Sequence, residues 1–170
     1  MLRPIVKYGS KVLEKPSKPV TNITDAEIKL IQDMVETMYK APGVGLAAPQ
    51  VGIGKRIMIT DTSAGEKKDH LITFLNPEIV LTEGEQYEEE GCLSIPGFTA
   101  EVIRPSKVVL RGLDLNGKEI TVEGSGLLAR AFCHEMDHLN GVFFIDHLSF
   151  IKRDLIKRKI RRLVKKGEWE

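Results

Sequence analysis

The residues best equipped for chemistry are two histidines and a glutamate in the run His134-Glu-Met-Asp-His138. Residues four apart share a helix face, so His134 and His138 can direct two imidazoles at one metal ion. Glu135 lies about 100° round the helix from His134, because one turn takes about 3.6 residues. That position is poor for a third ligand but lets the carboxylate act as general base on a metal-bound water. The run therefore predicts a hydrolytic metal site; the alternative is an ordinary amphipathic helix.

A hydrolytic metal usually has three protein ligands and one open position for water, so a third ligand is needed. One class of metalloprotease supplies a third histidine three residues after a glycine. Here Gly141 is in place, but Phe144 occupies the ligand position, which excludes that class. Few acids follow the motif, and most of them lie in or beyond a very basic segment. We therefore expect the third ligand to come from upstream.

Cys92 is the leading candidate for that ligand. It follows Gly91, whose missing side chain lets the backbone approach a bound group closely. Taken alone, Cys92 equally fits a small buried hydrophobic residue. Beside a histidine pair that lacks a ligand, it becomes the best third donor. Cys133 is less suitable, because it is adjacent to His134 and points off the ligand face.

A second notable segment is Gly43-Val-Gly-Leu-Ala-Ala-Pro-Gln50. Gly43, Gly45 and Ala48 formally match a dinucleotide-binding fingerprint, but that motif follows a strand and opens a helix. Here the segment follows a predicted helix and runs into Pro49, so we expect no nucleotide cofactor. It is better interpreted as a loop whose glycines allow close backbone approach. Gln50 adds a neutral amide donor, although an ordinary loop glutamine would look the same.

Composition limits the class of protein. With 170 residues, 42% hydrophobic and 29% charged, the chain is predicted to form one soluble globular domain, 1–170. No apolar run approaches the about 20 residues of a membrane span, and the start does not resemble a signal peptide. We therefore expect a cytoplasmic protein without membrane contact. In a reducing compartment, ligand, catalytic or core roles for the cysteines are favoured over a Cys92–Cys133 disulfide.

Charge is unevenly distributed, although the net charge is only +1. Residues 152–166 contain nine basic side chains and one acid, Asp154, so this span carries +8 and the rest of the chain −7. The sequence thus predicts an acidic body that ends in a basic helix.

The predicted elements place the candidate residues on a mixed scaffold. The capping pattern Thr24-Asp-Ala-Glu27 opens a helix that extends to about Tyr39, after an extended arm over 1–23. The metal helix spans 126–141 with a left-handed cap at Asn140 and Gly141, and Ser149 caps a last helix that extends to Lys166. Strands are expected at 56–60, 70–76, 78–82, 99–104, 106–113 and 119–122, with Pro77 dividing the second from the third.

The last two strands are predicted to form a hairpin at Asn116-Gly117, and 142–145 a short strand or turn. This order predicts an α+β fold: mostly antiparallel strands around a central metal-binding helix, with an N-terminal helix and a basic C-terminal helix.

Three separated motifs together resemble those of peptide deformylases: Gly43-Val-Gly-Leu-Ala-Ala-Pro-Gln50, Glu90-Gly-Cys-Leu-Ser94 and His134-Glu-Met-Asp-His138. The resemblance covers essentially the whole chain and is closest to the bacterial type without long insertions. It implies metal-dependent removal of the formyl group from N-formylmethionyl nascent peptides. One departure is Cys133, where many members have glutamine; this position points away from the ligands.

The resemblance also implies roles for individual residues. Metal ligands would be Cys92, His134 and His138, and Glu135 would be the acid/base residue. The oxygen of the formyl group would be held by Gln50 and by the backbone N–H of Leu93. Gly45 would pair with the substrate backbone, and the methionine pocket would be bordered by Val44, Leu127 and Ala131, with Arg130 making its rim less apolar. A Glu90–Arg104 pair would steady the loop of Cys92.

For the metal, the resemblance implies Fe²⁺ in the cell, with Zn²⁺, Ni²⁺ or Co²⁺ as substitutes; a thiolate ligand suits such ions. It also implies that the basic helix 150–166 contacts the ribosome, whereas the plainer interpretation is a solvated charged helix. Two other functions compete: a metallopeptidase that cuts internal amides, and a structural metal site in a protein that binds ribosome or RNA. A structural zinc needs four protein ligands, and the sequence offers three good ones.

Overall fold

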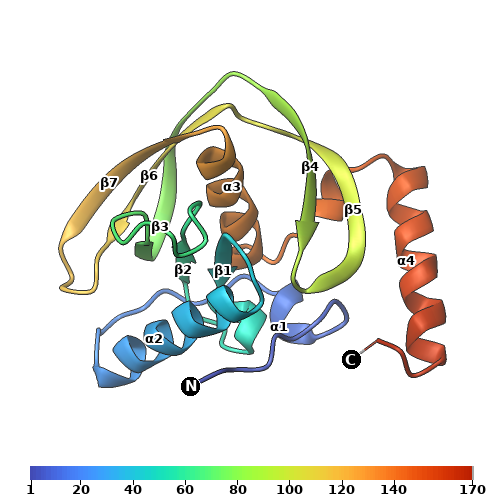
Figure 1. Cartoon of the computed structure of the whole chain (residues 1–170), viewed down its shortest axis with the longest axis horizontal. Helices are drawn as coiled ribbons and strands as arrows, with labels where there is room; N and C mark the ends of the chain where they lie inside the picture. Colours follow the sequence, from blue (N-terminus) through green and yellow to red (C-terminus); the bar gives the residue numbers. More distant parts are fainter. Residues whose placement is uncertain (170) are drawn as a thin grey trace.

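The structure is a computed structural model that describes residues 1–169, and it has the predicted α+β architecture (Figure 1). Its α-helices are α1 (Lys11–Glu14), α2 (Asp25–Lys40), α3 (Leu127–Leu139) and α4 (Phe150–Lys165), with 3-10 helices η1 (Ala48–Val51) and η2 (Phe144–His147). Its strands are β1 (Gly45–Ala47), β2 (Ile57–Thr60), β3 (Ile72–Glu83), β4 (Gln86–Cys92), β5 (Ile95–Arg104), β6 (Lys107–Leu113) and β7 (Glu119–Ser125).

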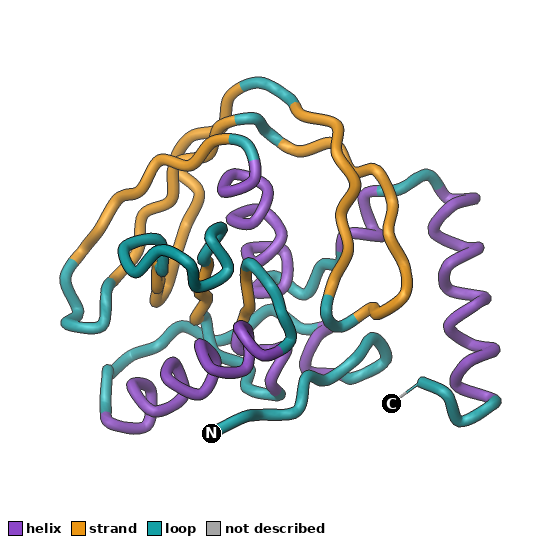
Figure 2. The backbone as a smooth tube through the Cα atoms, viewed as in Figure 1, coloured by secondary structure: helices purple, strands orange, loops and turns teal. Residues whose placement is uncertain are grey.

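All pairings between these strands are antiparallel within the described residues. A five-stranded sheet has the order β1-β2-β3-β6-β7, and β4 and β5 form a separate two-stranded sheet. The chain passes from β3 to β4 and back from β5 to β6, so the two sheets meet above α3 (Figures 1 and 2). Helix α3 therefore lies between the large sheet and the β4–β5 hairpin.

Helix α3 occupies this central position because one of its faces is apolar. Ala129, Phe132, Met136 and Leu139 are buried in one cluster with Met58, Phe74, Val108 and Leu110 of the large sheet. The helix ends as predicted, since Gly141 adopts φ +76° in the left-handed region that glycine tolerates. Asn140 stays outside that region and donates its N–H to Met136 O. The packing presents the opposite face of the helix to the β4–β5 hairpin.

Helix α2 begins with the predicted capping box, in which Thr24 Oγ1 accepts from a backbone N–H of the first turn and the Glu27 carboxylate accepts from Thr24 N. Its apolar side packs on the large sheet in a second cluster: Leu30, Ile31, Met34 and Met38 against Leu46, Ile57, Ile59 and Leu75. The predicted Asn116-Gly117 turn joins β6 to β7, and Gly117 has φ +76°. These local signals are confirmed.

Pro77 does not divide two strands as predicted. Strand β3 extends through it, but pairing with β6 shifts register between Leu75 and Glu78. Proline has no N–H to donate, and Asn76 before it adopts φ +53°, so the strand bulges instead of ending.

Three further expectations were incomplete. The arm over 1–23 contains the short helix α1, which buries Leu13 completely. Of the strand or turn expected at 142–145, the strand is absent, and the 3-10 turn η2 begins at Phe144. Strand β4 was not predicted, because its run of acids has little strand propensity; its pairing with β5 decides its conformation.

A third cluster joins the β4–β5 hairpin to the ends of the chain. Its buried members are Leu13, Ile95, Val102, Phe143, Phe144, Ile145 and Ile160. Helix α4 contributes Ile160 to it, while Ser149 Oγ accepts from Lys152 N at the start of the helix. Among the residues described, no helix is both long enough and apolar enough to cross a membrane.

The close approach of α3 to β7 depends on Gly124. A Cβ at this position would lie 2.8 Å from Leu128 Cγ and 2.9 Å from a Phe132 ring carbon. We expect Gly124→Ala to lower the free energy of unfolding by about 1–3 kcal/mol, the usual cost of overpacking, as measured by urea denaturation. Thr121→Ala, at an exposed position of the same strand, is the control. Equal midpoints for the two variants would contradict this account.

Candidate metal centre and substrate cavity

The side chains of Cys92, His134 and His138 converge. One donor atom from each lies within 4.8 Å of the others. His138 Nε2 is 3.2 Å from Cys92 Sγ and 3.2 Å from His134 Nε2. Metal–nitrogen and metal–sulfur bonds of about 2.0 and 2.3 Å put tetrahedral ligand atoms about 3.3–3.5 Å apart, so this spacing fits one bound ion. Burial lowers the pKa of His138 well below its usual value, which favours the neutral imidazole that binds metals.

Two elements bring these donors together. Helix α3 carries both histidines on the face opposite its apolar contacts with the large sheet, and Cys92 is the last residue of β4. A register shift between Gly91 and Cys92 ends the regular pairing of β4 with β5 at this point. Cys133 lies instead in the core beside the sheet, and burial raises the pKa of its thiol to about 11. Both cysteines are free, so the alternative of a disulfide between them was wrong.

Glu90 holds His134 in place. Its Oε2 lies 2.6 Å from His134 Nδ1, which directs Nε2 of that ring toward the other donors. The same carboxylate receives Arg104 Nε and Nη2 at 3.0 and 2.6 Å and Arg130 Nη1 at 2.9 Å. Burial opposes its ionisation, but hydrogen bonds from His134 and Arg104 outweigh that effect and hold the pKa of Glu90 well below its usual range. A carboxylate–histidine pair of this kind orients a metal ligand.

Arg130 lines the cavity, as expected, but its guanidinium is used in the interior. The residue is 5% exposed, and its guanidinium donates to Glu90, to Val102 O and to Gln86 Oε1. The two buried arginines carry one charge more than the Glu90 carboxylate, and Asp137, which accepts from Arg104, offsets that charge. The sequence contained the residue, but no local pattern showed its partner.

Glu135 extends toward Gly45 of β1 and is 3% exposed. A Cβ at Gly45 would lie 2.8 Å from Glu135 Oε1, so the glycine makes room for the carboxylate. Within residues 1–169, Glu135 Oε2 is buried without a hydrogen-bond partner. Burial raises the pKa of Glu135 to about 7, which suits a group that accepts and returns a proton near neutral pH.

Gln50 is held in one orientation by its neighbours. Its Oε1 accepts from Ala47 N at 3.0 Å, so the Nε2 donor faces the other way, 3.7 Å from Cys92 Sγ and 3.2 Å from Ser94 Oγ. The segment predicted to be a loop forms β1 and η1 at this point, which buries Gln50. Ser94 is a partner that the sequence analysis did not identify.

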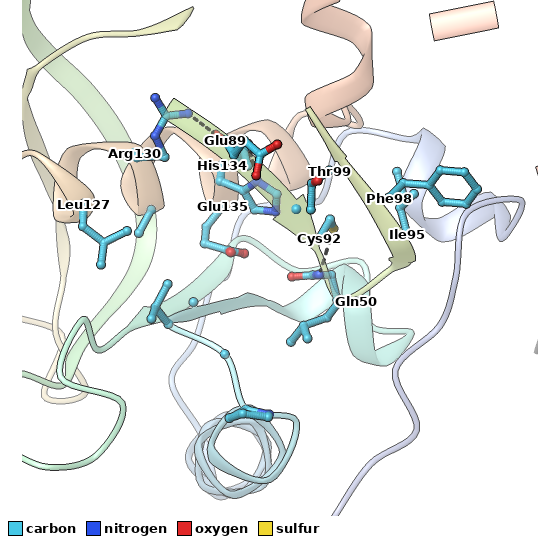
Figure 3. A pocket seen from close by; sticks show the side chains of 18 of the residues that line it. Gln50, Glu89, Cys92, Ile95, Phe98, Thr99, Leu127, Arg130, His134 and Glu135 are labelled. Atoms are coloured by element: carbon cyan, nitrogen blue, oxygen red, sulfur yellow. Dashed lines mark hydrogen bonds and ion pairs between the residues drawn. The ribbon is translucent and has the colours of Figure 1, made fainter. Parts of the chain in front are cut away.

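A cavity of about 560 Å³ opens beside these groups. Figure 3 shows Leu127 and Arg130 at one end of it, Cys92, His134, Glu135 and Gln50 in the middle, and Ile95 and Phe98 at the other end. The expected pocket residues Val44, Gly45, Leu127 and Ala131 all contribute to its wall, as does Leu93. Ile95, Phe98 and Thr99 also contribute, although the sequence analysis had not assigned them to the site.

A thiolate and two imidazoles beside a buried carboxylate form the donor arrangement of a mononuclear metal hydrolase. Residues 2–154 match the family model described as polypeptide deformylase. The chain belongs to this family, whose members are metal-dependent hydrolases.

Known relatives and a solved structure match this chain over most or all of its length. A peptide deformylase from Acidobacterium capsulatum is 50% identical over 169 residues, 99% of each chain. One from Halothermothrix orenii is 55% identical over 152 residues, 89% of this chain and 97% of the relative. The crystal structure of a peptide deformylase from Legionella pneumophila matches with a TM-score of 0.91 at 41% identity and covers 100% of this chain and 99% of that one.

Replacing Glu90 tests its place at the centre of the site. Glu90→Gln leaves the buried Arg130 guanidinium without a charged partner, leaves Arg104 with Asp137 alone, and releases His134, so we expect stability to fall by about 3–5 kcal/mol. Metal affinity is expected to fall about 10- to 100-fold, as usually follows loss of such an orienting group. Urea denaturation and metal titration check both values. Glu88→Gln, at an exposed position of the same strand, is the control, and identical behaviour of the two variants would refute the assignment.

Proposed function

We propose that this chain hydrolyses the N-formyl group from the formyl-methionine of newly made proteins and releases formate. The observation that carries the proposal is the convergence of Cys92, His134 and His138 beside Glu135, in a chain that belongs to the polypeptide deformylase family. In this proposal residues 1–170 act as one catalytic domain located in the cytoplasm.

Cys92, His134 and His138 would hold one divalent ion, Fe²⁺ in the cell, with Zn²⁺, Ni²⁺ or Co²⁺ able to replace it. The mixed sulfur and nitrogen donor set supports this choice, because such a set suits the softer divalent ions. When bound, the ion lowers the pKa of a water molecule so that hydroxide is available near neutral pH.

Glu135 accepts the proton of the attacking water and passes it to the departing amine. Its burial supports this role, since an ordinary exposed carboxylate is too weak a base near neutral pH. Within the described part of the chain, Oε2 has no competing hydrogen-bond donor, which leaves it free to accept the proton.

Gln50 Nε2 and the backbone N–H of Leu93 meet the negative charge that develops on the formyl oxygen. The contact from Ala47 supports this role for Gln50, because it prevents the amide from presenting its oxygen instead. Such a donor is already oriented before the reaction, and losing one typically costs about 10²–10³ in rate.

Gly45 aligns the backbone of the peptide, and Val44, Leu127 and Ala131 border the methionine side chain. The mainly apolar wall beside Leu127 supports an unbranched apolar side chain at this end of the cavity. We infer that the site accepts the formyl group and excludes the larger acetyl group of acetyl-methionine.

The reaction is tested by anaerobic assay of the Fe²⁺-loaded protein on a formyl-Met tripeptide, with the acetyl-Met analogue as control. Amine is expected from the formyl peptide alone. Glu135→Gln should retain one metal ion per chain while kcat falls at least about 100-fold, because only the proton acceptor is lost. His138→Ala should lose the metal, as measured by elemental analysis.

Two results would contradict these roles. Absence of amine release with a full complement of metal would leave a structural site or a different amide substrate. Loss of metal from Glu135→Gln would make that residue a ligand instead of a base.

Gly45 provides an independent test of the position of Glu135. In Gly45→Ala the new methyl group forces the Glu135 carboxylate to move, so kcat should fall about 100-fold with metal content unchanged. Gly54→Ala is the matched control, since its Cβ would make only an ordinary contact, 3.8 Å from Val12 Cγ2. Wild-type kcat in Gly45→Ala would contradict the proposed proton transfer.

We also propose that α4 contacts ribosomal RNA. Arg158, Arg161, Arg162 and Lys165 surround a shallow hollow on this helix, which suits phosphate groups. Because Ile160 of the same helix is buried, substitution of the charges is a cleaner test than truncation.

Replacing Arg158, Arg161 and Lys165 by glutamine should weaken ribosome binding about 10-fold or more at low salt and flatten its salt dependence. Deformylation of short peptides should be unchanged. Co-sedimentation over a salt series measures this effect, and unaltered binding by the triple variant would exclude the helix as the contact.

A further inference from the structure

The end of the chain folds back toward the substrate cavity. After α4, Gly167 adopts φ +70°, and its N–H donates to Val164 O while Glu168 N donates to Leu163 O. A glycine in this conformation ends a helix and reverses the chain. The segment after α4 turns back toward the rest of the molecule (Figure 1), which brings Trp169 to Tyr8 of the N-terminal arm and to Phe98 of the β4–β5 hairpin.

Trp169 has two specific contacts there. Its Nε1–H donates to Tyr8 O at 2.9 Å, which fixes the position of the indole. The indole packs edge-on against Phe98, with ring centroids 6.3 Å apart and an interplanar angle of 60°. Aromatic pairs favour this geometry. None of the steps assigned to the reaction uses Trp169.

Phe98 is also part of the cavity wall. It lies at the tip of the β4–β5 hairpin, and the cavity ends there against Ile95, Gly97, Phe98 and Thr99 (Figure 3). Ile95 is fully buried in the third core cluster, and Thr99 is exposed. Phe98 packs against that cluster but stays half-buried, and the edge-on contact with Trp169 adds to its support. These four residues are uncharged.

The contact with Tyr8 connects the indole to the catalytic segment as well. Tyr8 N donates to Ser94 O at 2.8 Å, and Ser94 Oγ accepts from Gln50 Nε2 at 3.2 Å. The indole, the N-terminal arm and the segment after Cys92 are thus joined by successive hydrogen bonds. Trp169 therefore lies behind the cavity wall, at the Phe98 end and not at the Leu127 end where methionine is proposed to bind.

We propose that Trp169 is a positioning residue that fixes Phe98 as a wall for the side chains that follow methionine in the formyl peptide. This inference rests on the proposed function. With methionine at the Leu127 end and the formyl group at Gln50, the peptide continues along the cavity toward the hairpin tip. The uncharged wall there favours an apolar or aromatic side chain, and loosening Phe98 weakens binding of that side chain without changing the reacting groups.

Two peptides of equal length separate this effect from general damage. Formyl-Met-Leu-Phe carries apolar side chains after methionine, and formyl-Met-Gly-Gly has none. In Trp169→Ala, KM for formyl-Met-Leu-Phe should rise about threefold to tenfold, the range that one aromatic contact supports, with kcat unchanged. Both constants for formyl-Met-Gly-Gly should stay within about twofold of wild type.

Glu168→Ala is the control, because this neighbouring side chain is exposed. A double-mutant cycle with Phe98→Ala then shows whether Trp169 acts through Phe98. Once Phe98 is truncated, adding Trp169→Ala should raise KM for formyl-Met-Leu-Phe no further.

Three results would overturn the inference: wild-type KM for formyl-Met-Leu-Phe in Trp169→Ala, an equal loss on both peptides, or effects of the two substitutions that multiply in the double variant. Inactivity of the wild-type protein on both formyl peptides would instead refute the proposed function itself.

Discussion

The buried Glu90 carboxylate is the interaction on which the site depends. A buried charge is costly unless it is fully paired, and here Arg104, Arg130 and His134 together satisfy it. Its partners come from the end of β5 and from α3, so the same group attaches the β4–β5 hairpin to the helix. That hairpin carries Cys92 and the helix carries both histidines. The electrostatic requirement of one side chain therefore brings the three donors into one place.

The network continues outward from Arg104. Its Nη1 donates to Asp137 Oδ2 at 2.7 Å, and the same oxygen lies 2.8 Å from His147 Nε2. Asp137 belongs to α3 and His147 to η2, so the polar groups around the site also connect α3 to the segment before α4. Because one carboxylate or guanidinium serves several partners, the energies of these contacts are not expected to be additive.

The position of α3 also depends on close approach to the backbone of neighbouring strands. Gly124 brings α3 against β7, and Gly45 leaves space for Glu135 beside β1. At neither position does the glycine have an unusual φ; what matters is the absence of a Cβ. The helix is thus placed from both sides, by apolar packing on the large sheet and by the paired charges on the hairpin. Because the helix has so little freedom, the Glu135 carboxylate is oriented before any substrate binds.

Much of this protein is encoded locally in the sequence. Several of its features depend on residues only a few positions apart, which periodicity or turn chemistry reveals. These are the capping box at Thr24, the turn at Asn116-Gly117, the left-handed helix end at Gly141, and the spacing of His134 and His138. The need for a third metal ligand, together with the resemblance of three motifs to a family, then pointed to Cys92.

Only the tertiary structure determined which side chains share a partner. Four features depend on groups that are distant in sequence and that meet through packing or through the pairing of buried charge. They are the partners of Arg130, the conformation of the acidic strand β4, the continuation of β3 through Pro77, and the contact of Trp169 with Phe98.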